Sequence, residues 1–110
     1  MVVGVCRVTL MVPESHSLKE KRMVLRRIKD RVANKFNCAI AEVGDQDNWQ
    51  SAELGFSVVS NEYGFTQSMV QKILTFIEDL AVAKVINDEQ DFLTYGDEVG
   101  GEPSHWEPDK

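Results

Sequence analysis

The chain has 110 residues, 43% of them hydrophobic and 27% charged, which indicates one globular domain and excludes two ordinary ones. The net charge of −6 argues against non-specific nucleic-acid binding by the chain as a whole. No apolar run approaches the roughly 20 residues that a membrane span needs, and the apolar N-terminus contains Arg7 and no signal-peptide cleavage site. We therefore expect a cytoplasmic protein without a membrane partner.

The two cysteines, Cys6 and Cys38, are expected to be reduced, as thiols of cytoplasmic proteins usually are. The sequence has no C-x-x-C motif, and His16 and His105 are far apart along the chain. It therefore offers no visible set of zinc ligands, and we predict neither a metal site nor a cofactor.

The first half of the chain predicts a strand followed by a helix. Residues 2–12 alternate between two faces, which is typical of a strand, and Pro13 ends it. Ser17 and Glu20 fit a capping box, in which Ser17 Oγ accepts from the Glu20 N–H and the Glu20 carboxylate accepts from the Ser17 N–H. The helix that follows has an apolar stripe of Leu18, Leu25, Ile28, Val32 and Phe36. We expect this helix to stop near Asn37.

Three further strands and one helix complete the expected set, with turn residues at 44–48. They are a strand over 38–43, a strand over 51–60, a helix from Phe65 or Thr66 to about Ala81, and a strand within 82–95. The last strand is expected to start between residues 83 and 86, with a bulge or break at 87–89.

The order βαββαβ predicts an α+β two-layer sandwich of the ferredoxin-like kind. Right-handed crossovers and a tight middle hairpin give a four-stranded antiparallel sheet in the order 4-1-3-2, with both helices on one face. Because the first two strands are then not neighbours, a Cys6–Cys38 disulfide is not expected. The domain covers residues 1–95, and residues 96–110 are expected to be an acidic flexible tail.

Several short runs carry a resemblance to a known family. They are residues 15–22 (SHSLKEKR), 41–44 (AEVG), 46–47 with 49–50, and 54–61. In these runs the chain resembles the YlxP-like family of small bacterial proteins, over roughly residues 1–86. The resemblance implies a ferredoxin-like fold, an unknown function, and no catalytic residue. It also implies genes that often lie beside translation-factor and ribosome-maturation genes. The chain departs from the family's pattern at Asn48 and after Tyr95.

Charge is distributed unevenly along the chain. Residues 17–35 hold eight Lys or Arg and two Asp or Glu, a net charge of +6, whereas residues 96–110 hold five acids and one base, a net charge of −4. The candidate polyanion-binding residues of the first helix are Lys19, Arg22, Arg26 and Lys29. A solvated helix face explains the same charges equally well, and the helix has no interleaved exposed aromatic residues.

The sheet face without helices is the second candidate surface. Apolar residues expected there are Val3, Val5, Met11 and Val59, joined by Cys38 and Ile40 if the second strand keeps its alternation. Arg7, Glu42 and Glu53 are expected within the same face, either as a catalytic group or, more simply, as ion pairs that fix register. An exposed apolar patch of this kind usually marks an interface, so we predict a homodimer.

Tryptophan supplies two candidate docking residues. Trp49, at the expected hairpin, is either a partner anchor or a hydrophobic plug over the sheet edge. Trp106, among acids and prolines in the expected tail, is either a docking residue or an incidental exposed one.

Together these patterns favour a non-enzymatic binding or assembly protein with an RNA- or ribosome-linked role. The alternative is a homodimeric regulator whose basic helix binds an acidic protein, and a small phosphohydrolase is a third hypothesis. Phe56 shares its face with Leu54 and Val58, so the base-stacking strand of an RRM domain is not expected. The loop over residues 13–17 has no glycine-rich phosphate cradle of the kind that an acylphosphatase-like enzyme would need.

Overall fold

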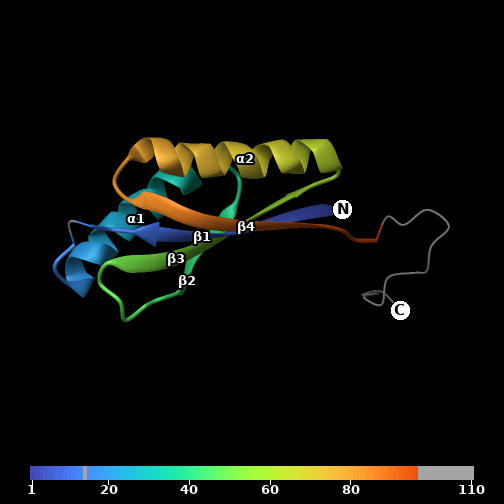
Figure 1. Cartoon of the computed structure of the whole chain (residues 1–110). Helices are drawn as coiled ribbons and strands as arrows, with labels where there is room; N and C mark the ends of the chain where they lie inside the picture. Colours follow the sequence, from blue (N-terminus) through green and yellow to red (C-terminus); the bar gives the residue numbers. More distant parts are fainter. Residues whose placement is uncertain (14, 97–110) are drawn as a thin grey trace.

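The computed structural model describes residues 1–13 and 15–96 and has the predicted order of elements (Figure 1). These are β1 (Val2–Met11), α1 (Leu18–Lys35), β2 (Ala39–Gly44), β3 (Ser51–Ser60), α2 (Tyr63–Leu80) and β4 (Lys84–Thr94). The four strands form one sheet in the order β2-β3-β1-β4, and every neighbouring pair is antiparallel. The predicted ferredoxin-like α+β sandwich is therefore confirmed.

The core lies between the sheet and the two helices, as the alternation of β1 and β3 predicts. Val8 pairs with Leu54 and Cys6 with Phe56, and all four side chains are buried. From the helices they meet the buried residues Leu25, Ile28, Val32, Val70, Ile73, Leu74 and Ile77. Phe56 is only 3% exposed, so its predicted place in the core is confirmed.

Helix α2 lies close against β1 because Gly4 has no side chain. A Cβ atom at Gly4 would lie 2.8 Å from Thr66 Cγ2 and 2.9 Å from Val70 Cγ2, which is too close for any larger residue. The helix begins at Tyr63, two or three residues earlier than predicted. Ser60 Oγ accepts a hydrogen bond from the Glu62 N–H at the residue before the helix, a local contact that the hydrophobic periodicity does not report.

The prediction of which β2 residues face the helices was wrong. Ile40 pairs with Phe56 and Glu42 with Leu54, so both share the helix-covered face with those core residues. Cys38 and Ile40 accordingly pack against the core, whereas Ala39, Ala41 and Val43 are exposed. The register with β3 decides which face each residue takes, and this register is not visible in a six-residue strand that is apolar on both faces.

Strand β4 contains the predicted irregularity one residue earlier than expected. Leu10 pairs with Val85 and Thr9 with Asn87, so Ile86 is the extra residue of a bulge. Beyond the bulge the strand stays paired with β1 as far as Thr94 and forms one edge of the sheet.

Candidate functional site

The start of α1 is built by the run of residues that carries the family resemblance. Ser17 caps the helix, and its Oγ accepts from the Glu20 N–H at 3.1 Å. The reciprocal half of the capping box differs from the prediction, because the Glu20 carboxylate accepts from the His16 N–H at 2.6 Å. Ser15 is buried, and its hydroxyl donates to the Ser17 carbonyl at 2.9 Å. These residues fix the direction in which α1 leaves the sheet.

Lys21 is the residue that sequence reasoning missed, because it is a charged side chain in the core. Its side chain is 1% exposed and its ammonium group donates to the carbonyls of Asp45 at 2.7 Å and Ser51 at 3.1 Å. It also lies 3.4 Å from a carboxylate oxygen of Glu42. Lys21 therefore connects α1 to both sides of the loop that joins β2 to β3.

The position of Glu42 corrects the expected set of charges on the helix-free face. Its pairing with Leu54 turns the side chain toward α1 and Lys21, so it is not on the helix-free face with Arg7 and Glu53. The apolar stripe of α1 contains the signal for this contact. Lys21 occupies the gap between Leu18 and Leu25 at the spacing of a buried position.

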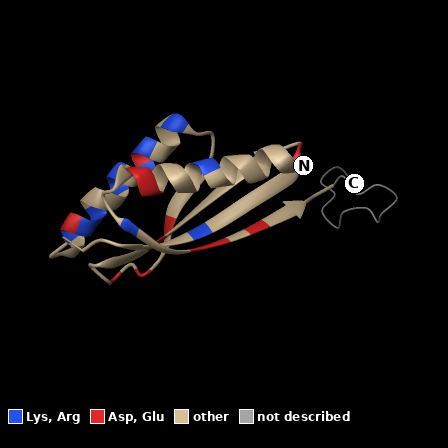
Figure 2. Cartoon of the chain, turned by 45° about the horizontal axis from the view of Figure 1, so that its top comes forward, with Lys and Arg blue, Asp and Glu red and all other residues tan. Residues whose placement is uncertain are grey.

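The basic surface of α1 is formed by all the Lys and Arg residues of this helix except the buried Lys21. Among the predicted residues, Lys19, Arg22 and Arg26 are exposed and Lys29 is half-buried. Arg27, Arg31 and Lys35 are exposed as well. Figure 2 shows the Lys and Arg positions following α1 along its length, with fewer on α2. Within residues 1–13 and 15–96, none of these seven side chains has a carboxylate within ion-pair distance.

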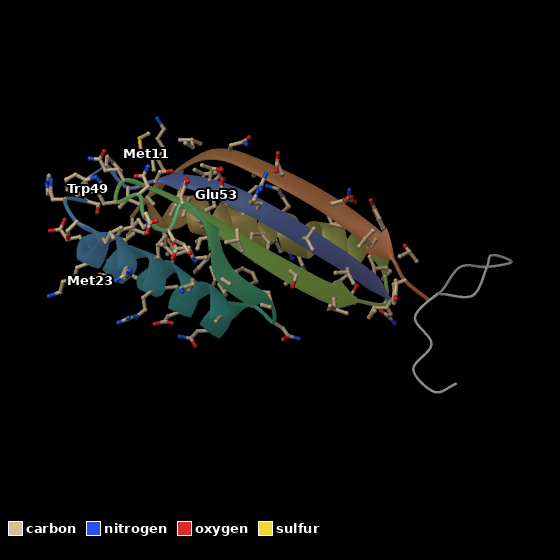
Figure 3. All side chains as sticks on the ribbon, turned by 90° about the horizontal axis from the view of Figure 1, so that it is seen from below. Met11, Met23, Trp49 and Glu53 are labelled. Carbon is tan, nitrogen blue, oxygen red and sulfur yellow. The ribbon has the colours of Figure 1, made fainter. Side chains whose placement is uncertain are left out.

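The helix-free sheet face, which we call the open face, contains the predicted apolar residues. Val5, Met11 and Val59 are 39%, 42% and 58% exposed, and Val3 is half-buried. Two residues that were not predicted, Val43 and Leu93, are also exposed there; Leu93 pairs directly with Val3. The open face is seen from below in Figure 3, where Met11 and Glu53 lie toward the same end of the sheet.

A groove of about 560 Å³ crosses the open face, and its lining combines small side chains with the charged residues Arg7, Glu89 and Asp91. It includes Ala39, Ala41, Gly55 and Ser57, with Val5 and Val43 beside them.

Arg7 and Glu89 form the ion pair of the open face. They are direct partners between β1 and β4, with Arg7 Nη2 2.5 Å from Glu89 Oε1. The hydrogen bond and charge of Glu89, followed by the charge of Glu53, raise the pKa of Arg7. Both side chains are more than half exposed, so the ion pair contributes little to the stability of the fold. Its main effect is to favour the register in which Arg7 lies opposite Glu89.

The docking residues and the thiols complete the predicted set. Trp49 follows the β2–β3 turn and is 46% exposed, at the same end of the molecule as Met11 (Figure 3). Trp106 and the predicted acidic tail from residue 97 onward lie outside the described residues.

Both thiols are free, and burial raises the pKa of Cys6 to about 11 and also raises the pKa of Cys38.

The described residues contain neither a cluster of metal ligands nor a membrane-spanning helix. No group of three or more His, Cys, Asp or Glu side chains in residues 1–13 and 15–96 is placed to hold a metal ion. Over the same ranges, no helix combines the length and the apolar composition that crossing a membrane requires.

The fold and these surfaces define a small ferredoxin-like domain with a basic helix and an open sheet face. Residues 3–90 match the family model described as "Protein of unknown function (DUF503)". The chain is 42% identical over 77 residues to "Uncharacterized protein YlxP" of Bacillus subtilis (strain 168), an alignment that covers 70% of this chain and 84% of that protein. The chain therefore belongs to this YlxP-like family of unknown function, as its sequence motifs predict.

Among solved structures, the chain is similar to a de novo designed protein with a ferredoxin fold, determined by solution NMR. The two share 16% identity and a TM-score of 0.49, over 97% of this chain and 98% of the other. The fold assignment rests instead on the strand order and the register of this chain.

Proposed function

We propose that this protein is a non-enzymatic binding protein whose helix α1 contacts the phosphates of RNA, in a role linked to the ribosome. The observation that carries the proposal is the basic surface of α1. Seven of its eight Lys and Arg side chains reach solvent, and Lys21 alone is withdrawn into the core. The exposed ones have no carboxylate partner among the described residues, so their charge is available to a polyanion.

The arrangement of the remaining charge supports the same proposal. The acids Asp88, Glu89 and Asp91 are on β4, at the sheet edge opposite β2, and α1 packs on the β2 side. The acids of β4 therefore lie away from α1, whereas Glu42, Asp45, Asp47 and Glu53 lie on or next to β2 and β3. The link to the ribosome comes from the gene neighbourhood that the family resemblance implies, which is an association and supplies no mechanism.

The open face supports the second part of the proposal, which is a homodimer. Exposed Val5, Val59 and Leu93 share one sheet face with a groove whose lining includes several small residues. Because a two-fold interface brings the same surface together from both copies, branched side chains of one copy can enter the groove of the other. Exposed apolar residues gathered on one sheet face are typical of an interaction surface.

Fluorescence anisotropy with a labelled RNA, measured over a salt series, tests the role of α1. We expect the variant Arg22→Glu/Arg26→Glu/Lys29→Glu to weaken binding and flatten the salt dependence. For each phosphate that the variant no longer neutralises, the log–log slope should fall by about 0.9 for a duplex and about 0.7 for a single strand. The single change Arg22→Glu, compared with Lys84→Glu at the start of β4, provides a control with the same change in charge.

Assays on the same purified proteins distinguish RNA binding from the two other candidate functions. Binding of poly-glutamate at least as strong as binding of RNA would favour the alternative, an acidic protein partner for α1. A phosphohydrolase would turn over acyl phosphates. The hydroxyls of Ser15 and Ser17 are both engaged in hydrogen bonds at the helix start, which favours a structural role for them. RNA affinity equal to that of the wild type in the triple charge reversal would refute the proposal.

A further inference from the structure

The two helices form a second groove where the end of α1 meets α2. This groove of about 570 Å³ lies between the end of α1 and the middle of α2 and has the volume of a small-ligand site, about 300–1,000 Å³. Its lining includes Lys35 and Phe36 from the end of α1 and Lys72, Thr75 and Phe76 from α2.

The groove contains two aromatic rings, whereas the exposed face of α1 has none. The rings of Phe36 and Phe76 meet edge to face, with centroids 5.5 Å apart and planes at 79°. Both residues are half-buried, so they pack against the core and also line the groove. Forty residues separate them in sequence, and α1–α2 contact brings them together.

Positive charge lies directly over these rings. The Lys35 ammonium group is 5.5 Å from the Phe76 ring centroid and 5.9 Å from that of Phe36, within cation–π range. Lys72 lines the same groove, and Asp79 is its one acidic residue. Lys35 is also the last basic residue of α1 and lies one helical turn from Arg31, so the groove borders the Arg31 side of the basic surface.

We propose that this groove holds one unpaired nucleotide of a single-stranded RNA bound along α1. The base stacks on the exposed part of the Phe76 ring, because the Phe36 ring stands at 79° to it and cannot lie flat on the same base. Lys35 and Lys72 contact the flanking phosphates. The flexible Lys35 side chain moves its ammonium group from the rings to a phosphate, since a lysine stem allows several positions for one charge. Aromatic stacking with backbone contacts by cations is the general mode of single-strand binding. This inference rests on the proposed function and adds a preference for single strands.

The experiment measures anisotropy of a labelled 12-nucleotide single-stranded RNA with the full chain and with Phe76→Leu. Leucine keeps an apolar side chain in the core but removes the flat ring. We expect binding to weaken roughly 5- to 100-fold, the range that loss of one stacked base gives. The matched control is Phe65→Leu, which removes an exposed ring in the first turn of α2, outside the groove, and leaves affinity unchanged.

Three further measurements separate stacking from charge and from misfolding. An abasic oligonucleotide of the same length and charge should bind the wild type and Phe76→Leu equally and more weakly than RNA with bases. Lys35→Gln should lower the salt slope by about 0.7, whereas Phe76→Leu leaves the slope unchanged. Circular dichroism and thermal melts establish that both variants are folded.

The outcomes distinguish this inference from the proposed function. If no RNA binds the wild-type protein, both are wrong. If RNA binds but Phe76→Leu, Phe65→Leu and the wild type have the same affinity, or abasic RNA binds as well as RNA with bases, the groove is not a nucleotide site and only the phosphate contacts of α1 stand. Binding of free adenosine monophosphate with the affinity of the 12-nucleotide RNA would assign the groove to a free nucleotide and overturn the RNA assignment.

Discussion

Replacement of Lys21 by methionine tests whether the charged side chain in the core holds the β2–β3 hairpin against α1. Methionine keeps most of the apolar stem and removes the ammonium group. The carbonyls of Asp45 and Ser51 then lose their side-chain donor, and Glu42 loses the cation 3.4 Å away. We therefore expect Lys21→Met to lower the free energy of unfolding strongly.

The magnitude follows from these three interactions of the ammonium group. Hydrogen bonds from a charged donor contribute about 1.5–3 kcal/mol each, so the two bonds to the carbonyls supply most of the loss and the longer contact with Glu42 adds less. Because these contributions overlap, we expect a decrease of about 3–5 kcal/mol for Lys21→Met. The corresponding fall in Tm for a domain of this size is roughly 15–30 °C.

Substitution of the partner residue, Glu42→Gln, is expected to lower the free energy of unfolding much less. The Glu42 carboxylate oxygen beside Lys21 makes no hydrogen bond within the described part of the chain, and its side chain is 19% exposed. Glutamine leaves the two carbonyl interactions of Lys21 in place, so we expect a decrease below about 1.5 kcal/mol. Unequal costs of this kind indicate that the carbonyls, more than the carboxylate, hold Lys21.

Urea unfolding followed by far-UV circular dichroism measures both variants against Lys19→Met, an exposed lysine two residues away on the same helix. The control should stay within about 0.5 kcal/mol of the wild type. If Lys21→Met is within about 1 kcal/mol of the wild type, or if Glu42→Gln costs as much as Lys21→Met, the reasoning about the buried lysine is wrong.

Three more predictions concern the core, the open face and the thiols. Phe56→Ala should cost about 3–5 kcal/mol in urea unfolding because it leaves a core cavity, and a neutral result would contradict its burial. Val5→Lys should convert a dimer to a monomer in light scattering, whereas Met23→Lys, at an exposed site on α1, should not; a wild-type monomer at high concentration would remove the interface. Burial raises the pKa of Cys6 from 9.0 to about 11, so the unfolded state loses this proton first and stability should fall as pH rises across that range. Cys6→Ala should abolish that part of the pH dependence, and an unchanged profile would contradict it.

The fold was predictable where local patterns determine structure. Alternation in β1 and β3 gives the face of each residue, and Ser17 marks the start of α1. Strand β2 was not predictable in phase, because its apolar residues fall on both faces and only its register with β3 decides between them. The expectation that Glu42 shares a face with Arg7 failed for the same reason.

The candidate sites show a similar division between local and long-range information. The basic surface of α1 follows from composition and helical periodicity, which are both local. The burial of Lys21 was signalled by its place in the apolar stripe, but its partners are on a hairpin more than twenty residues away. The groove with Phe36 and Phe76 depends on the packing of two helices, which no single segment encodes.

The basic surface of α1 and the open face lie on opposite layers of the sandwich, and this arrangement decides how they can act together. Helix α1 covers the core side of the sheet, so a dimer closed through the open face leaves both copies of α1 on the outside. Dimerisation and polyanion binding then do not compete for surface. One RNA that reaches both helices binds the second at a high effective concentration, whereas a short RNA contacts only one. Val5→Lys should therefore weaken binding of a long RNA, even though it adds a positive charge, and leave a short one unaffected. An equal or stronger affinity of that monomeric variant for long RNA would show that each copy acts alone.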